Sequence, residues 1–204
     1  MSEQSTNELS EKEKMLRGQL YDSGTDLSLV GDRHRVKDLC FKFNNTLPSK
    51  REKRRKLFKK IVGKCGDNVT VESPFWCDYG YNIEIGENFY ANHNTVILDC
   101  AKVKFGDNIF IAPNCGFYTA GHPIDYERRN QGLEYALPIT IGDNVWIGGG
   151  VQIMPGVTIG SNVVIGGGSV VCKDIPSDCV AVGNPCRVLR KITEADKTKF
   201  YGNK

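Results

Sequence analysis

The most constraining feature of this sequence is an isoleucine that returns every six residues from Ile141 to Ile165, a series that Val171 continues. On a helix, six residues turn a side chain by about 240°, so the series would scatter over three faces. In an extended chain, six is a whole number of strand periods, and all these side chains point to one side. The repeat therefore excludes a helix and predicts short strands.

Turn-forming dipeptides recur between these apolar positions at the same spacing. They are Asp143-Asn144, Gly149-Gly150, Pro155-Gly156, Ser161-Asn162 and Gly167-Gly168, and Lys173-Asp174 keeps the spacing without being a turn former. A chain that bends every six residues winds into a coil of short strands, and stacked coils bury their inward side chains against one another. The span predicts a solenoid.

The same repeat extends upstream with interruptions. Its positions are Ile85, Ala91 and Ile97, then, after a slip of two residues, Phe105, Ile111 and Phe117, with Val71 and Cys77 as a poorly formed beginning. The one large break covers residues 121–138. Loops of that length inside a compact domain usually carry function, so we expect this one to be used.

Residues before 65 follow a helical pattern instead, and we expect three short helices at about 10–21, 33–44 and 50–62. The pairs Ser10/Glu13 and Ser49/Glu52 fit capping boxes, Asp32 is a candidate cap for the middle helix, and Gly31, Pro48 and Gly63 punctuate the ends. The expected organisation is a helical N-terminal segment (1–64), a solenoid (65–190) with the loop 121–138, and a C-terminal tail (191–204).

Composition narrows the function classes only a little. The net charge is +3, which permits anionic partners without implying them. Residues 50–60 hold eight basic residues in eleven, which favours the solvated face of the third helix and leaves nucleic-acid or anionic-surface binding as the alternative.

No apolar run is long enough to span a bilayer and the first residues are polar, so we expect a cytoplasmic protein without membrane or nucleic-acid partners. Eight scattered cysteines are expected to be free thiols.

Five segments carry a family resemblance: EKEKMLRGQLYD, CDYGYNIEIGENFYANHN, YTAGHPID, PITIGDNVWIGGG and AVGNPCRVLRKI. In these the sequence resembles the hexapeptide-repeat acyltransferases, and among them the bacterial maltose and galactoside O-acetyltransferases. The resemblance implies a mainly β fold, a left-handed parallel β-helix with a short helical N-terminal segment and one extended loop. It also implies a homotrimer with active sites between subunits, acetyl-CoA as donor, a sugar as acceptor and no required metal.

His122 is the expected catalytic base. It lies where the repeat breaks into the loop, before Pro123, and it matches the catalytic histidine of the family. A sugar hydroxyl needs a base to remove its proton as it attacks, and imidazole titrates in the useful range. By the same resemblance, the backbone N–H of Gly149 would stabilise the oxyanion formed on the thioester carbonyl.

The resemblance also suggests residues for the two substrates. Asn92 would hold the acceptor hydroxyl toward the histidine, and the weaker acceptor candidates are Tyr90, Asp99, Glu134 and either Asp22 or Ser23. For the CoA phosphates the candidates are Lys173, Arg187 and Arg190, since cations suit phosphate, and Trp146 and the Gly167 backbone would line the pantetheine path. His93 stands where relatives commonly have phenylalanine, and its role stays open.

Three other functions fit a solenoid. A γ-type carbonic anhydrase needs three histidine ligands for zinc, but His34 lies in the helical region and no second histidine closely follows His122. A non-catalytic binding protein would not need the loop histidine or Asn92. Acetyl transfer to another hydroxyl or to an amine is the nearest alternative. The sequence favours a sugar hydroxyl without fixing which sugar or which hydroxyl.

Overall fold

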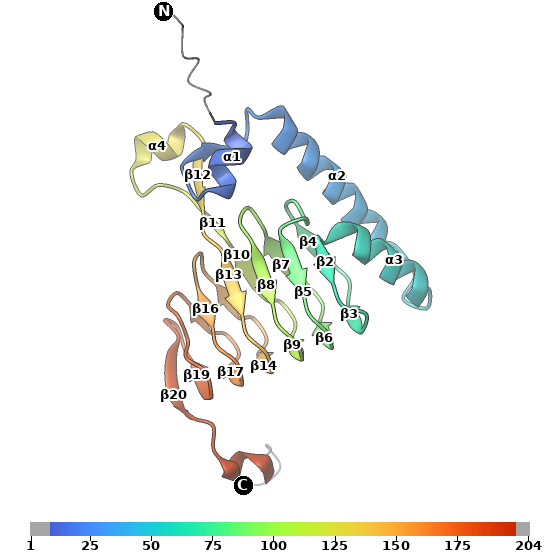
Figure 1. Ribbon diagram of the computed structural model, residues 1–204, viewed down its shortest axis with the longest axis vertical. Coiled ribbons are helices and arrows are strands. Elements are labelled where there is room, and N and C mark those ends of the chain that lie inside the picture. The colour runs from blue at the N-terminus through green and yellow to red at the C-terminus, as the bar shows by residue number, and fades with distance from the viewer. Residues whose placement is uncertain (1–8, 199–204) are drawn as a thin grey trace, which may run out of the picture.

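The solenoid expected from the repeat is present in the computed structural model, which describes residues 9–198. Short strands run in parallel along three faces, and each, apart from the last strand (Arg187–Lys191), pairs with strands one turn away rather than with its neighbours in sequence. Figure 1 shows the strands stacked turn upon turn, with the long helices at the N-terminal end. The structure confirms the mainly β fold class as a parallel β-helix.

The chain visits the three faces in a fixed order. The first face contains β4 (Phe75–Cys77), β7 (Thr95–Leu98), β10 (Gly116–Tyr118), β15 (Gln152–Ile153) and β18 (Val170–Val171). The second contains β2 (Lys64–Cys65), β5 (Ile83–Ile85), β8 (Val103–Phe105), β13 (Ile139–Ile141) and β16 (Thr158–Ile159). The third contains β3 (Val69–Val71), β6 (Phe89–Ala91), β9 (Ile109–Ile111), β14 (Val145–Ile147), β17 (Val163–Ile165), β19 (Cys179–Val182) and, antiparallel to β19, β20 (Arg187–Lys191).

Three edges join these faces, and each is named here for what it carries. The asparagine edge leads from the second face to the third and includes Asn108 and Asn144. The glycine edge leads from the third face to the first and includes Gly149 and Gly167. The loop edge leads from the first face to the second and carries residues 119–138.

The inward side chains form one continuous core. The isoleucines at 141, 147, 153, 159 and 165 are each at most 1% exposed, as the six-residue repeat predicts. Phe105 lies between Phe89 and Phe117 in edge-to-face packing, with ring centroids 5.2 and 5.0 Å apart. Burial of side chains of this size contributes roughly 1.5–3 kcal/mol each, so the stacked core is the main source of stability.

The asparagine edge repeats one contact from turn to turn. Asn88 donates its side-chain amide to Asn108 (2.8 Å), and Asn108 donates in the same way to Asn144 (3.0 Å). All three have φ between 55 and 59°, a left-handed conformation that asparagine tolerates better than most residues. Gly150, Gly156, Asn162 and Gly168 also have positive φ, whereas Lys173 and Asp174 do not, so five of the six predicted corners are confirmed.

The helices differ from their predicted bounds. The structure has α1 at Glu11–Leu16, α2 at Leu27–Asn44 and α3 at Arg51–Ile61. The capping box of Ser10 and Glu13 is confirmed. A 3-10 helix, η1 (Glu194–Thr198), follows β20, and among residues 9–198 no helix is long and apolar enough to cross a membrane.

The other two predicted caps are wrong. Asp26, not Asp32, caps α2, because its carboxylate accepts the N–H groups of Ser28 and Leu29; Gly31 therefore lies inside the helix. The Ser49/Glu52 box is absent: the first helical bond of α3 is Arg54 N–H to the carbonyl of Lys50, so Ser49 lies outside the helix.

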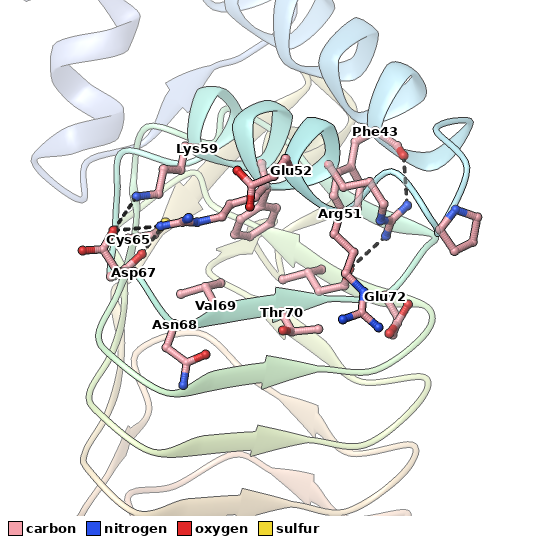
Figure 2. Close-up of a pocket in the computed structure, with 16 residues that line it drawn as sticks. Phe43, Arg51, Glu52, Lys59, Cys65, Asp67, Asn68, Val69, Thr70 and Glu72 are labelled. Carbon is pink, nitrogen blue, oxygen red and sulfur yellow. Dashed lines mark hydrogen bonds and ion pairs between the residues drawn. The ribbon is translucent and has the colours of Figure 1, made fainter.

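A buried arginine joins the helices to the solenoid. Arg54 of α3 donates to the carbonyls of Phe43 (3.3 Å), Thr46 (3.2 Å) and Val71 (3.0 Å) and to the hydroxyl of Ser73 (2.8 Å). Figure 2 shows this junction, where α3 lies across the open edge of β3. One core cluster continues from α2 and α3 into the first turns, so the helices cap the solenoid. The predicted boundaries between the helical segment, the solenoid and the C-terminal tail, at residues 64/65 and 190/191, stay a prediction.

The extended loop has structure of its own. It contains β11 (Ala120–Gly121), α4 (Tyr126–Asn130) and β12 (Leu133–Ala136), and β12 pairs antiparallel with both β11 and the N-terminal strand β1 (Tyr21–Asp22). The register places Tyr21 opposite Glu134 and Asp22 opposite Leu133. The loop and the N-terminal segment, more than a hundred residues apart in sequence, therefore form one small sheet beside the loop edge.

Candidate active site

His122 lies directly after β11, on the loop edge. Its Nδ1 is 3.0 Å from the carbonyl oxygen of Leu133, and because a carbonyl only accepts, Nδ1 carries the proton in this contact. In the neutral ring Nε2 is then the nitrogen without a hydrogen, and His122 is exposed at the surface of the chain. This arrangement orients the imidazole as a proton acceptor.

Two predicted acceptor residues lie beside the histidine. Leu133, which holds the His122 ring, is followed by Glu134, whose carboxylate accepts hydrogen bonds from the hydroxyls of Tyr21 (2.7 Å) and Ser23 (2.9 Å). Asp22 is opposite Leu133 in the sheet, and its carboxylate accepts the backbone N–H groups of the following turn. The structure therefore brings His122, Glu134, Asp22 and Ser23 to one place.

Asp99 does not belong to this group, which corrects the prediction for that residue. Its side chain is fully buried, and its carboxylate accepts the N–H groups of Asp78 (3.1 Å), Tyr79 (2.8 Å) and Asn82 (3.3 Å). Burial raises the pKa of Asp99 to about 7. Because its oxygens hold the turn of the preceding rung and none of its surface is exposed, Asp99 has a structural role.

Two polar residues that the sequence analysis did not select lie near the same place. Arg33 of α2 donates to the hydroxyl of Tyr79 (2.7 Å) and to the carbonyl of Ser23 (2.7 Å). Asp78 follows β4 on the loop edge, where burial raises its pKa, and the thiol of Cys100 lies 3.7 Å from its carboxylate. A polar residue at a solenoid corner has no distinctive spacing, so only the fold shows that these side chains converge.

Asn92 is on a different edge from His122. It follows β6 on the glycine edge, where its side-chain oxygen accepts the N–H of His93 (2.8 Å). Asn92 precedes β7, whereas His122 comes after β10, which stacks directly on β7. A strand of four residues separates the two edges by about 10 Å or more at 3.3 Å per residue. A single chain therefore does not bring Asn92 and His122 together.

Gly149 shares the glycine edge with Asn92. Its carbonyl accepts the N–H of Gly168 (2.8 Å), which stacks one turn onto the next. Within residues 9–198 its own N–H has no hydrogen-bond partner, and a side chain placed there would contact only the Pro113 carbonyl, at 3.5 Å. An unpaired amide beside open space is available to a developing oxyanion.

Similarity to known proteins decides the family. Residues 14–66 match the maltose acetyltransferase hexapeptide capping motif, and residues 138–173 match the bacterial transferase hexapeptide family of six repeats. The chain is 49% identical to the galactoside O-acetyltransferase of Escherichia coli K12 over 191 residues, 93% of each protein. It belongs to the maltose and galactoside O-acetyltransferases.

Solved structures agree with this assignment. A maltose O-acetyltransferase from Clostridium difficile 630 is 55% identical, with a TM-score of 0.90 over 92% of this chain and 100% of that one. A galactoside acetyltransferase in complex with coenzyme A is 47% identical, with a TM-score of 0.92 over 95% of this chain and 96% of that one. The protein is thus an acetyltransferase that shares its fold with these enzymes over more than nine tenths of its length.

The predicted cofactor residues of this acetyltransferase fall on two sides of the solenoid. Lys173 lies exposed on the loop edge after β18, whereas Arg187 and Arg190 lie exposed on β20, beside the third face. Both terminal nitrogens of Arg190 are hydrogen-bonded to the carboxylate of Asp196, at 2.8 and 2.9 Å. A phosphate would have to compete with Asp196 for Arg190, but not for Lys173.

An apolar row runs down the outside of the third face of the acetyltransferase. Tyr90, Phe110, Trp146 and Val164 are in register on consecutive strands, and Phe110 and Trp146 are 56% and 51% exposed. Trp146 lies in β14, and Gly149 follows the end of that strand by two residues, on the glycine edge. Two exposed aromatic side chains on adjacent strands are a candidate for an interaction surface.

The two remaining histidines are elsewhere. His34 lies on α2, and His93 on the glycine edge has its Nδ1 against the Ser73 carbonyl. Across residues 9–198 no three His, Cys, Asp or Glu side chains cluster as a metal site would require.

Proposed function

We propose that this protein transfers an acetyl group from acetyl-CoA to a hydroxyl group of a sugar, with His122 as the general base. The observation that carries the proposal is the contact between His122 Nδ1 and the Leu133 carbonyl, which leaves Nε2 free to accept a proton. Family membership supports the acetyl transfer, and the CoA complex of a related enzyme supports acetyl-CoA as donor.

The reaction requires one proton acceptor and one oxyanion donor. The acceptor hydroxyl attacks the thioester carbonyl carbon while His122 Nε2 takes its proton, and a tetrahedral oxyanion forms. The unpaired N–H of Gly149 would stabilise that oxyanion. Collapse breaks the carbon–sulfur bond, and the CoA sulfur takes the proton back from His122, which releases CoA and the acetyl ester.

The distribution of these residues over two edges favours a homotrimer. His122, Glu134 and Asp22 lie at the loop edge, while Asn92 and Gly149 lie at the glycine edge of the same chain. If the loop edge of one subunit packs beside the glycine edge of the next, each interface between subunits contains all five of these residues. The apolar row with Phe110 and Trp146 is positioned to be covered in such an interface.

The two substrates would meet in this interface. Lys173, Arg187 and Arg190 supply cations for the CoA phosphates, and Trp146 and the Gly167 backbone border the pantetheine arm. On the acceptor side, Asn92 and Tyr90 would come from one subunit, and Glu134, Asp22 and Ser23 from its neighbour. Carboxylates, amides and hydroxyls suit a ligand with several hydroxyl groups, which supports a sugar.

The test is an acetyl-CoA consumption assay over a panel of mono- and disaccharides and amines, with His122→Ala measured in parallel. We expect ester formation on a pyranoside hydroxyl and at least about a hundredfold lower kcat in the variant, since positioned bases contribute about 10²–10⁴-fold. Transfer to amines only would exclude the sugar, and unchanged turnover in His122→Ala would exclude the base.

A further inference from the structure

The basic run in α3 has no part in the proposed reaction, yet it makes this helix strongly positive. Helix α3 carries seven basic residues and one acidic residue, Glu52. It packs on α2 and on the first turn of the solenoid, away from the loop and β1 that surround His122. Its charge therefore requires an explanation apart from catalysis.

The structure divides these basic residues into three sets. Arg54 faces inward and is buried, so its role is structural. Arg55 and Lys59 both reach Asp67, at 3.1 and 2.9 Å, on the side of the helix that faces the first rung, as Figure 2 shows. Arg51 also points from α3 toward that rung in Figure 2.

The third set faces solvent. Lys53, Lys56 and Lys60 are exposed, and no carboxylate in residues 9–198 lies within ion-pair distance of any of them. They are spaced i, i+3 and i+7, so they share one face of the helix over about 10 Å. The half-buried Leu57 lies among them, and the four residues line a shallow hollow of about 370 Å³.

We propose that this face, which we call the lysine face (Lys53, Lys56, Leu57 and Lys60), docks an acidic helical segment of another protein. A helix with carboxylates at matching spacing and one apolar residue between them would pair with the three lysines and cover Leu57. An apolar centre within a charged rim is the usual anatomy of a protein interface. The unpaired lysines would also steer such a partner to the surface.

Two other anionic partners fit less well. A membrane-surface helix buries an apolar face in the lipid, but the apolar side chains Phe58 and Ile61 of α3 are already buried against the protein. Single-stranded nucleic acid is usually held by aromatic stacking as well as charge, and the lysine face has no aromatic residue. Both partners nevertheless belong in the test.

The test uses fluorescence anisotropy with defined probes on the full-length protein. The first probe is a 20-residue helical peptide with three glutamates at i, i+3 and i+7 around one leucine; the second has serine in place of that leucine. A single-stranded oligonucleotide of 20 thymidines and vesicles containing phosphatidylserine are the other probes. We expect the leucine peptide to bind best and its affinity to fall at least about tenfold between 50 and 300 mM salt.

Three variants connect binding to the lysine face. Lys53→Ser/Lys56→Ser/Lys60→Ser should lower peptide affinity at least about tenfold, and Leu57→Ser should lower it for the leucine peptide but not for the serine peptide. The matched control replaces the exposed lysines Lys42, Lys64 and Lys104, and should leave binding unchanged. Acetyl transfer and thermal unfolding should be unchanged in the lysine variants, which separates this proposal from the proposed function.

Four results would overturn the proposal. They are no measurable binding of the leucine peptide, equal loss of affinity in the control triple variant, indifference to Leu57→Ser, and tighter binding of vesicles or oligonucleotide than of the peptide. The last result would reassign the lysine face to a lipid or nucleic-acid partner.

Discussion

The asparagine edge and the loop edge run along the same solenoid but follow opposite rules. Along the asparagine edge, Asn88, Asn108 and Asn144 have the same backbone conformation. The side-chain amide of Asn88 donates to Asn108, and that of Asn108 donates to Asn144. At the loop edge the repeat stops: residues 121–138 leave the coil, pair with β1 and position His122. The comparison teaches that the repeat supplies a regular frame and that the proposed base lies where the repeat is interrupted.

The largest expected effect concerns the repeating frame. Phe105→Ala removes the middle ring of the buried aromatic stack, and we expect a loss of about 3–5 kcal/mol in the free energy of unfolding, measured by urea denaturation. Its neighbour Lys104 points outward on the same strand, and Lys104→Ala should change stability by less than about 0.5 kcal/mol. Equal losses of unfolding free energy in the two variants would contradict the alternation of inward and outward side chains along β8.

The next effect concerns the junction between the frame and the helices. Arg54→Met keeps much of the side-chain volume but leaves the buried carbonyls of Phe43, Thr46 and Val71 without their donor, and we expect a loss of about 3 kcal/mol. Lys53→Met, one residue away and exposed, is the matched control and should be nearly neutral. Thermal unfolding of the two variants measures the difference, and a neutral Arg54→Met would show that the helices do not depend on this arginine.

The smallest effect concerns the loop edge. Glu134→Ala removes the acceptor for the hydroxyls of Tyr21 and Ser23, so the contact between loop and N-terminal strand weakens by about 1.5 kcal/mol. We expect the acceptor KM to rise about tenfold while the KM for acetyl-CoA is unchanged, in steady-state kinetics. Glu84→Ala, on the second face, should alter neither constant; an equal rise in both KM values for Glu134→Ala would argue against an acceptor role.

The sequence predicts the frame well because the frame is periodic. The isoleucine series fixes which side chains point inward, and the corner residues fix where the chain bends, so both follow from local chemistry. The start of α2 is less predictable, since Asp26 and Asp32 are both good caps. Leu29, a buried residue four positions before the expected start at 33, stands two residues before Gly31 in a weak apolar pattern. Tertiary packing decides between two equivalent local signals.

The candidate site is only partly predictable for a related reason. The position of His122 at the break of the repeat marks it in the sequence, but the pairing of Tyr21 with Glu134 joins residues 113 positions apart, which no local spacing encodes. Asp78 and Asp99 are both aspartates at loop-edge corners. Only the fold shows that Asp99 is buried under backbone N–H groups while Asp78 faces the thiol of Cys100.

The amide contacts of the asparagine edge have a consequence for how such a protein can change in length. Asn68, Asn88 and Asn108 each donate a side-chain amide to the asparagine of the next turn, so a copy of one of these turns would find its partners already in place. Growth or shortening of the coil by whole turns therefore needs no new corner chemistry. A change of any other length would break the alignment of Asn108 with its neighbours and leave their amides unmatched.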